Sequence, residues 1–474
     1  MIFTSFEFVA FFVAVMVIRR YLRSFTVEKS FLLVASYVFY MSWNVPAALL
    51  ILSTSLLDFY LARRLGQIDA PQSRKRLLIV SLTANLGVLA FFKYTNFLLD
   101  TGVFGLNLLG MHVNSVHYKI LLPVGISFFT FQSMSYTIDV YRRHLPPCAS
   151  ARDFLLYVAF FPQLAAGPIV RAADFLPQLK QRLRPSALDI ETGLVQFAVG
   201  AIKKLVIADQ ISPHVDLIFA TPANYDGLTL LQGIIGYAIQ IYCDFSGYSD
   251  MAIGSARMMG FRFPENFQMP YSAVTITEFW RRWHMSLSSW LRDYVYIPLG
   301  GNRNGTMRTY VNLMLTMVLG GLWHGASWNF VFWGGLHGVS LAIHKVWTSW
   351  NPLAPLQGRP EFRAVWQLFS RVLTLSVVLL GWIFFRADSW SAATQYVSRL
   401  MTWSHDGTRL VSPYILAAIA AVSLAHLVVP KDRLWVREIP AGALSVRVLV
   451  YSSLALLLAC LAATDTAPFI YFQF

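Results

Sequence analysis

Two histidines, His284 and His324, are the residues of this chain whose type and surroundings best suit acid–base chemistry. The first lies in the aromatic, basic run TEFWRRWHMSLSSWLRDYVYIPLGG, and the second lies in the glycine-rich apolar run VLGGLWHGASW. An ionisable side chain is costly in apolar surroundings and usually has a function there. Imidazole titrates near neutral pH, so either side chain could accept a proton from a hydroxyl. The rest of the chain is expected to place these two residues.

His324 is predicted to lie deep in a membrane-spanning helix. If the preceding residues are helical, Gly320 and Gly321 lie one turn below it, so another helix or a thin substrate could approach. The rise from Tyr310 to His324 is about 21 Å, and the hydrocarbon core is about 30 Å thick. A neutral imidazole at this depth could act as a general base on a hydroxyl. The alternative is a packing histidine bonded to a backbone carbonyl.

His284 is predicted to lie on an amphipathic helix at the cytoplasmic interface. On such a helix it would share a face with Trp280 and Ser288, while Arg281 and Arg292 project elsewhere. The two arginines could hold an anionic group such as the phosphates of a thioester carrier. Interfacial anchoring by the tryptophans and arginines alone is the simpler alternative. In the same run, Glu278 is spaced to pair with Arg282.

Other polar residues carry weaker signals. Asp244 and Asp250 could be helix caps, an ion site or part of a catalytic network, and capping is the simplest interpretation. Cys243 has no visible neighbouring base, which favours a buried small residue over an acyl-accepting nucleophile. The pair Lys203 and Lys204 most simply reaches lipid phosphate.

His337, in the run WGGLHG, could support His324. Signatures of Ser/His/Asp hydrolases, of phosphate-binding loops and of dinucleotide-binding folds are absent from the sequence. The three cysteines form no CxxC pair, so neither a disulfide framework nor a metal site can be argued.

Composition places the scaffold in a membrane. Of the 474 residues, 56% are hydrophobic and only 13% are charged, whereas soluble chains have about 25% charged residues. We expect one polytopic membrane domain over residues 1–474. The net charge of +14 does not indicate nucleic-acid binding, because Lys and Arg cluster in short segments between apolar runs, as in cytoplasmic loops.

Charge and hydropathy together predict the topology. The first apolar run precedes its arginines, which is typical of an uncleaved first helix and not of a signal peptide. Residues 153–168 are too short to cross and contain prolines, so they are expected to be re-entrant or interfacial. Segment 273–308 should face the cytoplasm, whereas loops 210–227 and 386–409 should lie outside. About twelve crossings with both termini outside are expected: 2–18, 30–43, 46–62, 77–97, 119–139, 189–209, 228–243, 309–325, 327–346, 364–385, 412–429 and 446–465.

Several motifs resemble one known family. The run FWRRWHMSLSSWLRDYVYIPLGG, followed by LGGLWHG and WGGLHG, resembles the membrane-bound O-acyltransferases. Further stretches resemble its bacterial exopolysaccharide branch, which includes the alginate O-acetylation membrane protein. They are FFKYTNF (91–97), LPVGISFFTFQSMSYTIDVYR (122–142), FFPQLAAGPIVR (160–171), YCDFSGYSDMAIG (242–254), MGFRFPENFQMPY (259–271) and PFIYFQF (468–474).

The resemblance implies an all-α polytopic membrane fold with about 11–13 transmembrane helices, plus re-entrant or interfacial helices, around a central tunnel. It implies that the core motif region spans about residues 120–345. His324 corresponds to the family's catalytic histidine, and His284 corresponds to the second histidine of the bacterial branch. The implied location is the bacterial inner membrane, and no bound cofactor or metal is implied.

The implied activity moves an acyl group, most simply acetyl, from a cytoplasmic thioester such as acetyl-CoA toward a secreted polysaccharide such as alginate or cellulose. His324 would act as general base, while His284 or an indole N–H would hold the thioester or its oxyanion. An acyl-histidine intermediate is the alternative. The substrate-binding residues expected from both runs are Trp323, Arg281, Arg282, Trp283, Arg292, Asp293, Gly320 and Gly321.

The implied partners are the lipid bilayer, a periplasmic acyltransferase that could receive the acyl group on a serine, and a polysaccharide synthesis and secretion complex. Three other functions stay open at this point. The first is D-alanyl- or peptidoglycan-type acyl transfer. The second is transport of an acyl donor without bond chemistry, which the lack of repeated halves disfavours. The third is a scaffold for polysaccharide secretion.

Overall fold

The computed structural model describes the whole chain except residues 165–166, 354–356, 358, 429–442, 462–468 and 471–474. It forms two compact units, residues 1–197 with 251–264, and residues 198–250 with 265–474. The described residues form helices joined by turns and irregular loops, and the β-structure among them is limited to an isolated bridge between Tyr225 and Thr408. The all-α fold class is therefore confirmed. The prediction that the chain forms a single domain stays a prediction.

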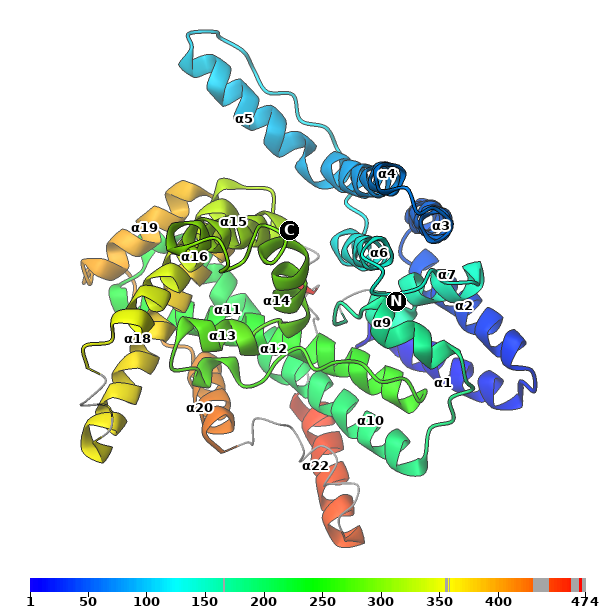
Figure 1. Cartoon of the computed structure of the whole chain (residues 1–474). Helices are drawn as coiled ribbons and strands as arrows, with labels where there is room; N and C mark the ends of the chain where they lie inside the picture. Colours follow the sequence, from blue (N-terminus) through cyan, green and yellow to red (C-terminus); the bar gives the residue numbers. More distant parts are fainter. Residues whose placement is uncertain (165–166, 354–356, 358, 429–442, 462–468, 471–474) are drawn as a thin grey trace. The chain divides into compact units, whose positions relative to one another are not determined.

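The first unit contains the N-terminal helices (Figure 1). In chain order they are α1 (Phe6–Tyr21), α2 (Phe25–Met41), α3 (Val45–Gln67), α4 (Pro71–Leu89), η1 (Ala90–Tyr94), α5 (Thr95–Leu108), α6 (Ile126–Tyr141), α7 (Ala151–Ala159), α8 (Phe161–Leu164), α9 (Ala172–Phe175), η2 (Leu176–Leu179) and α10 (Ala187–Ala201), of which the last four residues belong to the second unit.

The second unit carries both candidate histidines. Its elements are η3 (Ile202–Ala208), α11 (Asp209–Ala220), η4 (Pro222–Asn224), α12 (Gly227–Met258), η5 (Pro270–Ser272), α13 (Ile276–Arg282), α14 (Met285–Leu291), η6 (Arg292–Tyr296), α15 (Thr306–His324), α16 (Trp328–Trp350), α18 (Pro360–Arg386), α19 (Trp390–Met401), α20 (Pro413–Val428) and α22 (Leu444–Leu461). The end of α12, from residue 251, belongs to the first unit.

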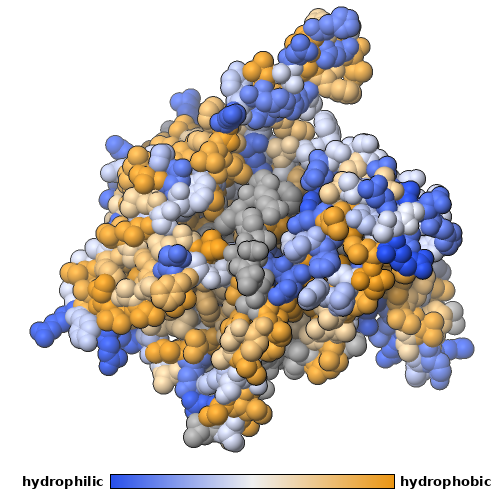
Figure 2. Space-filling view, turned by 180° about the vertical axis from the view of Figure 1, so that it is seen from behind, coloured by the Kyte–Doolittle hydropathy of each residue, from blue (hydrophilic) through white to orange (hydrophobic). Residues whose placement is uncertain are grey.

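Several helices are long and apolar enough to cross a bilayer. Among the described residues they are α3, the continuous stretch Pro71–Leu108, α12 and α18, with shorter apolar helices at Pro413–His426 and Ser445–Leu461. Hydrophobic side chains also cover much of the face drawn in Figure 2. These features confirm a multi-pass membrane protein, whereas the expected twelve crossings stay a prediction. Residues 151–164 form two short buried helices with a break at Phe160, so neither helix could cross alone.

The helix α12 is longer than the sequence predicts. The expected span near 228–243 is wrong at its end, because the helix continues for 32 residues to Met258. Such a helix is about 48 Å long, which exceeds the thickness of the hydrocarbon core. Most of its residues are buried, and two of them contact the site: the ring of Phe245 meets that of His284 at 4.6 Å, and Ser249 Oγ accepts a hydrogen bond from Asn266 Nδ2 at 3.2 Å.

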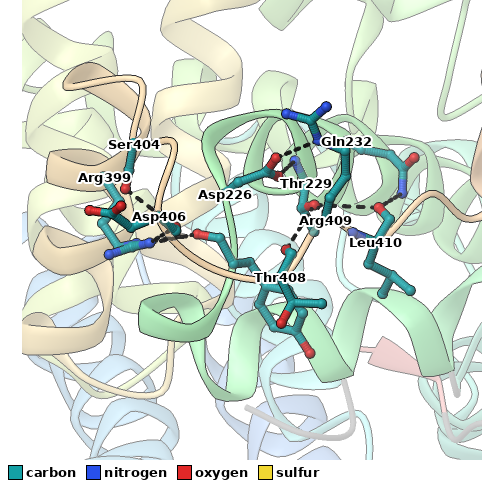
Figure 3. Close-up of polar contacts among 10 residues, drawn as sticks. Asp226, Thr229, Gln232, Arg399, Ser404, Asp406, Thr408, Arg409 and Leu410 are labelled. Atoms are coloured by element: carbon teal, nitrogen blue, oxygen red, sulfur yellow. Dashed lines mark hydrogen bonds and ion pairs between the residues drawn. The ribbon is translucent and has the colours of Figure 1, made fainter.

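A polar clasp, which we define as residues 226–229 with residues 408–410, fixes the start of α12 (Figure 3). The Arg409 Nε donates to Asp226 Oδ2 at 2.7 Å, and the Thr229 backbone N–H donates to Asp226 Oδ1 at 2.9 Å. In return, the Leu410 N–H donates to Thr229 Oγ1 at 2.9 Å. The clasp joins two loops that the charge pattern assigns to the outer side of the membrane. Their contact is consistent with that assignment.

A buried carboxylate joins three helices of the first unit. Asp58 of α3 accepts hydrogen bonds from Ser81 Oγ at 2.5 Å and Asn85 Nδ2 at 2.8 Å, both on α4. It also accepts one from Ser133 Oγ of α6 at 2.6 Å. A buried carboxylate is tolerated only when its oxygens are satisfied in this way. The three donors therefore fix how these helices pack.

Replacing Asp58 with leucine is expected to destabilise the detergent-solubilised protein, because three buried donors would lose their acceptor. The expected cost is about 1–3 kcal/mol for each donor left unsatisfied. The measurement is the midpoint of thermal unfolding. The matched control is Asp69→Leu, because Asp69 pairs with Arg143 at the surface and its side chain is 94% exposed. Equal midpoints for the two variants would contradict a structural role for Asp58.

Candidate active site

His324 is the last residue of α15, directly before the turn into α16. Only 3% of its surface is exposed. The hairpin of α15 and α16 is so close that a Cβ on Gly321 would lie 2.1 Å from the Phe330 backbone oxygen. A Cβ on Gly334 would lie 2.3 Å from the Met317 oxygen. The missing side chain of Gly321 therefore lets the two helices touch, which is one of the two alternatives expected for these glycines, and a role of Gly321 in substrate binding stays a prediction.

Gly320 faces a different neighbour. A Cβ at this position would lie 3.1 Å from Leu291 Cδ1 of α14 and would meet no other atom within 4 Å. Of the two glycines expected to line a passage, only Gly320 therefore leaves space beside the hairpin. This space lies one helical turn before His324.

Aromatic rings surround the imidazole of His324. The centroids of the Trp323, Trp333 and Phe385 rings lie 4.9, 5.0 and 5.2 Å from its own. The Trp333 indole N–H is buried, and no described residue accepts a hydrogen bond from it. The imidazole of His324 thus lies beside an indole N–H that donates to no described residue, and a base next to a donor is the pairing that base-catalysed acyl transfer needs.

Trp323 brings the two predicted histidines together. Its ring centroid is 4.9 Å from that of His324 and 5.8 Å from that of His284, with both contacts edge-to-face. The histidines are forty positions apart in the chain, on α15 and at the start of α14. The sequence prediction that both belong to one site is consistent with this geometry.

The backbone at His284 differs from the prediction. The expected continuous helix is wrong, because His284 lies between α13 and α14 with a φ of 43°, in the left-handed region. Few non-glycine residues adopt this conformation, and they cluster at functional sites. The bend turns the imidazole fully into the protein, where 0% of the residue is exposed.

Asn266 determines which nitrogen of His284 carries the proton. Its Oδ1 accepts hydrogen bonds from the backbone N–H of Ser286 at 3.2 Å and from the Ser286 hydroxyl at 2.9 Å. His284 Nδ1 lies 3.3 Å from the same oxygen, so Nδ1 is the donor and Nε2 is left as the basic nitrogen. Burial lowers the pKa of His284 to about 3, which keeps the ring neutral near pH 7.

A groove of about 640 Å³ lies at the other end of the α15–α16 hairpin. Its lining includes Arg281 of α13, Arg292 of η6 and both His344 and Lys345 of α16. Its apolar part reaches Met317, two helical turns or about 11 Å before His324. The lining thus combines cationic side chains with apolar ones such as Met317, which suits a ligand that has an anionic head and an apolar arm.

The remaining expected binding residues have distinct places. Arg282 ion-pairs with Glu278, as the spacing predicts, and donates to Ser272 Oγ at 2.6 Å. Asp293 pairs with Arg292 at 2.7 Å and does not line the groove. Trp283 is fully buried behind His284, 5.0 Å from the ring of Trp382. It packs the site from behind and is not in the groove.

Two interpretations of the lysines and aspartates are wrong. Lys203 is 2.7 Å from Asp250, and Lys204 is 2.7 Å from Asp244, so neither lysine reaches lipid phosphate. Both aspartates lie in the middle of α12 and cap no helix. Cys243 is buried, as the sequence favours.

His337 supports the site from α16. Its Nδ1 accepts a hydrogen bond from Trp280 Nε1 at 3.3 Å, and its ring lies 4.8 Å from that of Trp333. It therefore contacts the ring that contacts His324. In the described part of the chain, no cluster of His, Cys, Asp or Glu could hold a metal ion.

Sequence reasoning missed Asn266, Trp333, His344 and Lys345. Asn266 does lie inside the motif MGFRFPENFQMPY, but nothing in the motif says which residue it contacts. His344 and Lys345 lie in the predicted span 327–346, where a hydropathy pattern gives no sign of a groove.

The sequence profile of the membrane-bound O-acyltransferases (MBOAT) matches residues 2–377. The chain belongs to this family. It is 41% identical to the probable alginate O-acetylase AlgI of Pseudomonas aeruginosa, over 90% of this chain and 79% of that protein. It is 34% identical to the peptidoglycan O-acetyltransferase of Helicobacter pylori, over 82% of this chain and 77% of that one.

A more distant relative is the teichoic acid D-alanyltransferase of Bacillus subtilis, 28% identical over 49% of this chain and 62% of that protein. The family and its O-acetyltransferase members confirm the predicted resemblance and the enzyme class. This MBOAT chain is an O-acyltransferase.

Changing Asn266 to aspartate is expected to move the acidic limb of the pH–rate profile to higher pH. A carboxylate beside Nδ1 favours the imidazolium and raises the pKa of His284 from about 3, by roughly one to three units. The protonated ring no longer offers Nε2 as an acceptor, so activity is lost at a higher pH than in the wild type. The control is Asn302→Asp on the exposed loop before α15. Superimposable profiles would refute the assigned contact.

Proposed function

We propose that this MBOAT enzyme takes an acetyl group from a cytoplasmic thioester, most simply acetyl-CoA, and passes it across the inner membrane for O-acetylation of a secreted polysaccharide. His324 is the general base. The observation that carries the proposal is the pair of buried imidazoles in contact with the indole of Trp323. A transporter or a scaffold has no need for two buried imidazoles around one ring.

The groove supports the part of this proposal that concerns where the acyl donor binds. Arg281, Arg292 and Lys345 line it and offer guanidinium and ammonium groups to phosphate oxygens. Part of the groove lining, including Arg281 and Arg292, belongs to segment 273–308, which the charge pattern assigns to the cytoplasm, where thioester donors are made. A pantetheine arm extended from the phosphates would follow the apolar lining past Gly320 toward His324.

The chemistry follows from the neighbours of His324. Its imidazole removes the proton of an acceptor hydroxyl, and the hydroxyl oxygen attacks the thioester carbonyl. The Trp333 N–H is the nearby donor that can hold the developing oxyanion, and the second imidazole, whose Nε2 only accepts hydrogen bonds, helps to hold the thioester. When the carbon–sulfur bond breaks, the imidazolium returns its proton to the thiolate, which leaves as the free thiol. An acyl-histidine on His324, formed before the hydroxyl arrives, is the alternative order of steps.

The acceptor enters from the opposite side. His324 ends α15 close to the start of α16, where Asn329 Nδ2 bonds the backbone oxygen of Ala387 at 2.9 Å. Ala387 opens the loop 386–409, which the charge pattern places outside. The acceptor is a polymer sugar or a serine of a periplasmic acyltransferase within a polysaccharide secretion complex. The alginate O-acetylases among the relatives favour an alginate-like polymer, with cellulose as a further choice, whereas the peptidoglycan relative supports peptidoglycan as the runner-up.

Replacing His324 with alanine is expected to abolish polymer acetylation while the protein still accumulates in the membrane. Loss of a general base lowers the rate by about 10²–10⁴-fold. Polymer acetylation is measured in cells that express each variant, and the release of free CoA by purified protein given acetyl-CoA labelled in the acetyl group is followed in parallel. His112→Ala, on an exposed loop of the first unit, is the control. Polymer acetylation at the wild-type level in the His324 variant would exclude this role.

Replacing Lys345 or Arg281 with alanine is expected to raise the KM for acetyl-CoA about tenfold, with kcat nearly unchanged. The reason is that a phosphate contact is made equally in the ground state and in the transition state. Steady-state kinetics of CoA release measure the effect, and Lys75→Ala on exposed α4 is the control. An unchanged KM in both groove variants would show that the donor binds elsewhere.

A further inference from the structure

Two residues near the C-terminus, Phe469 and Ile470, are buried in the second unit beside the middle of α12. Phe469 is 0% exposed. The backbone N–H of Ile470 donates to Asp244 Oδ2 at 2.8 Å. Because both residues are buried and the backbone N–H of Ile470 is bonded to a buried side chain, they are held by a specific interaction and not by surface packing alone.

The carboxylate that holds Ile470 belongs to a buried charge cluster. Lys204 Nζ is 2.7 Å from Asp209 Oδ1 and 2.7 Å from Asp244 Oδ1, and the lysine side chain is 1% exposed. One ammonium therefore faces two carboxylates. The second oxygen of Asp244 needs a further donor, because a buried charged oxygen without one is costly. The N–H of Ile470 provides that donor.

The ring of Phe469 extends this contact toward the active site. It packs against Tyr248 at a centroid distance of 4.4 Å and against Phe245 at 5.5 Å. Phe245 in turn meets the imidazole of His284 at 4.6 Å, with the two rings perpendicular. Phe245 is thus held between Phe469 on one side and the second histidine on the other.

We propose that Phe469 and Ile470 are positioning residues of the active site, which hold Phe245 against His284 and keep water away from that imidazole. This inference rests on the proposed function. Ile470 anchors the segment to Asp244, and Phe469 supplies the ring that supports Phe245. Exclusion of water matters for this reaction, because a thioester beside a general base is hydrolysed whenever water replaces the acceptor hydroxyl.

The test follows how the acetyl label is divided between two products. Inside-out membrane vesicles, from cells that express the full chain and make its polymer, receive acetyl-CoA labelled in the acetyl group. Ester label in the polymer reports transfer, and free labelled acetate reports hydrolysis. In Phe469→Ala, the ratio of transfer to hydrolysis is expected to fall about tenfold. Phe469→Leu, which keeps apolar bulk, is expected to restore most of the ratio.

A matched pair at the neighbouring position tests the anchor. Ile470→Pro removes the N–H that bonds Asp244, whereas Ile470→Ala keeps it and removes only side-chain bulk. The proline variant is expected to show the low ratio, and the alanine variant a ratio near that of the wild type. The amount of each variant in the membrane is measured in parallel, so that the ratio is compared at known protein levels.

Different outcomes separate this inference from the proposed function. Wild-type vesicles that place no label in the polymer would refute the proposed function. Wild-type transfer with an unchanged ratio in Phe469→Ala and Ile470→Pro would refute the positioning role alone. A third outcome is that transfer and hydrolysis fall together, or that all the variants are lost from the membrane. The two residues would then only stabilise the fold, and the inference would likewise be overturned.

Discussion

The shared ring contact of Trp323 with His284 and His324 is the interaction on which the rest of the second unit depends. An imidazole without charge survives in an apolar interior only if its N–H has an acceptor and its ring has close neighbours. The unit meets both needs with residues from four separate elements. Asn266 provides the acceptor at one histidine, and α15, α16 and α18 supply the rings at the other.

The sequence predicts the residue types that could do chemistry at the site better than it predicts how those residues are arranged. His284 and His324 stand out because ionisable residues are rare in apolar runs, and the pairing of Glu278 with Arg282 follows from the helical period alone. The left-handed backbone at His284 has no comparable signal, because it depends on Asn266, eighteen positions earlier in the chain. A local pattern cannot contain a contact with a residue that is distant in sequence.

The length of α12 was missed for a related reason. Asp244 and Asp250 interrupt its apolar run, and a hydropathy scale scores each aspartate as a charged residue without regard to an ion-pair partner. Their partners, Lys203 and Lys204, lie on η3, and the ion pairs make the charges acceptable inside the protein. The role of the glycines in α15 could not be decided for a similar reason, because an absent side chain can make room for a substrate or for a neighbouring helix. Only the position of α16 decides between the two.

The tight hairpin of α15 and α16 also limits how this enzyme can change. At Gly321 and Gly334 each helix touches the backbone of the other, so there is no side chain whose rotamer could adjust to a substitution. Substitutions in the hairpin core are therefore expected to prevent folding before they can change the reaction. New donors or acceptors have to be accommodated elsewhere, in the groove lining and the outer loops, where side chains are free to vary. The fold thus fixes the packing of the hairpin core and leaves substitution to the groove lining and the loops.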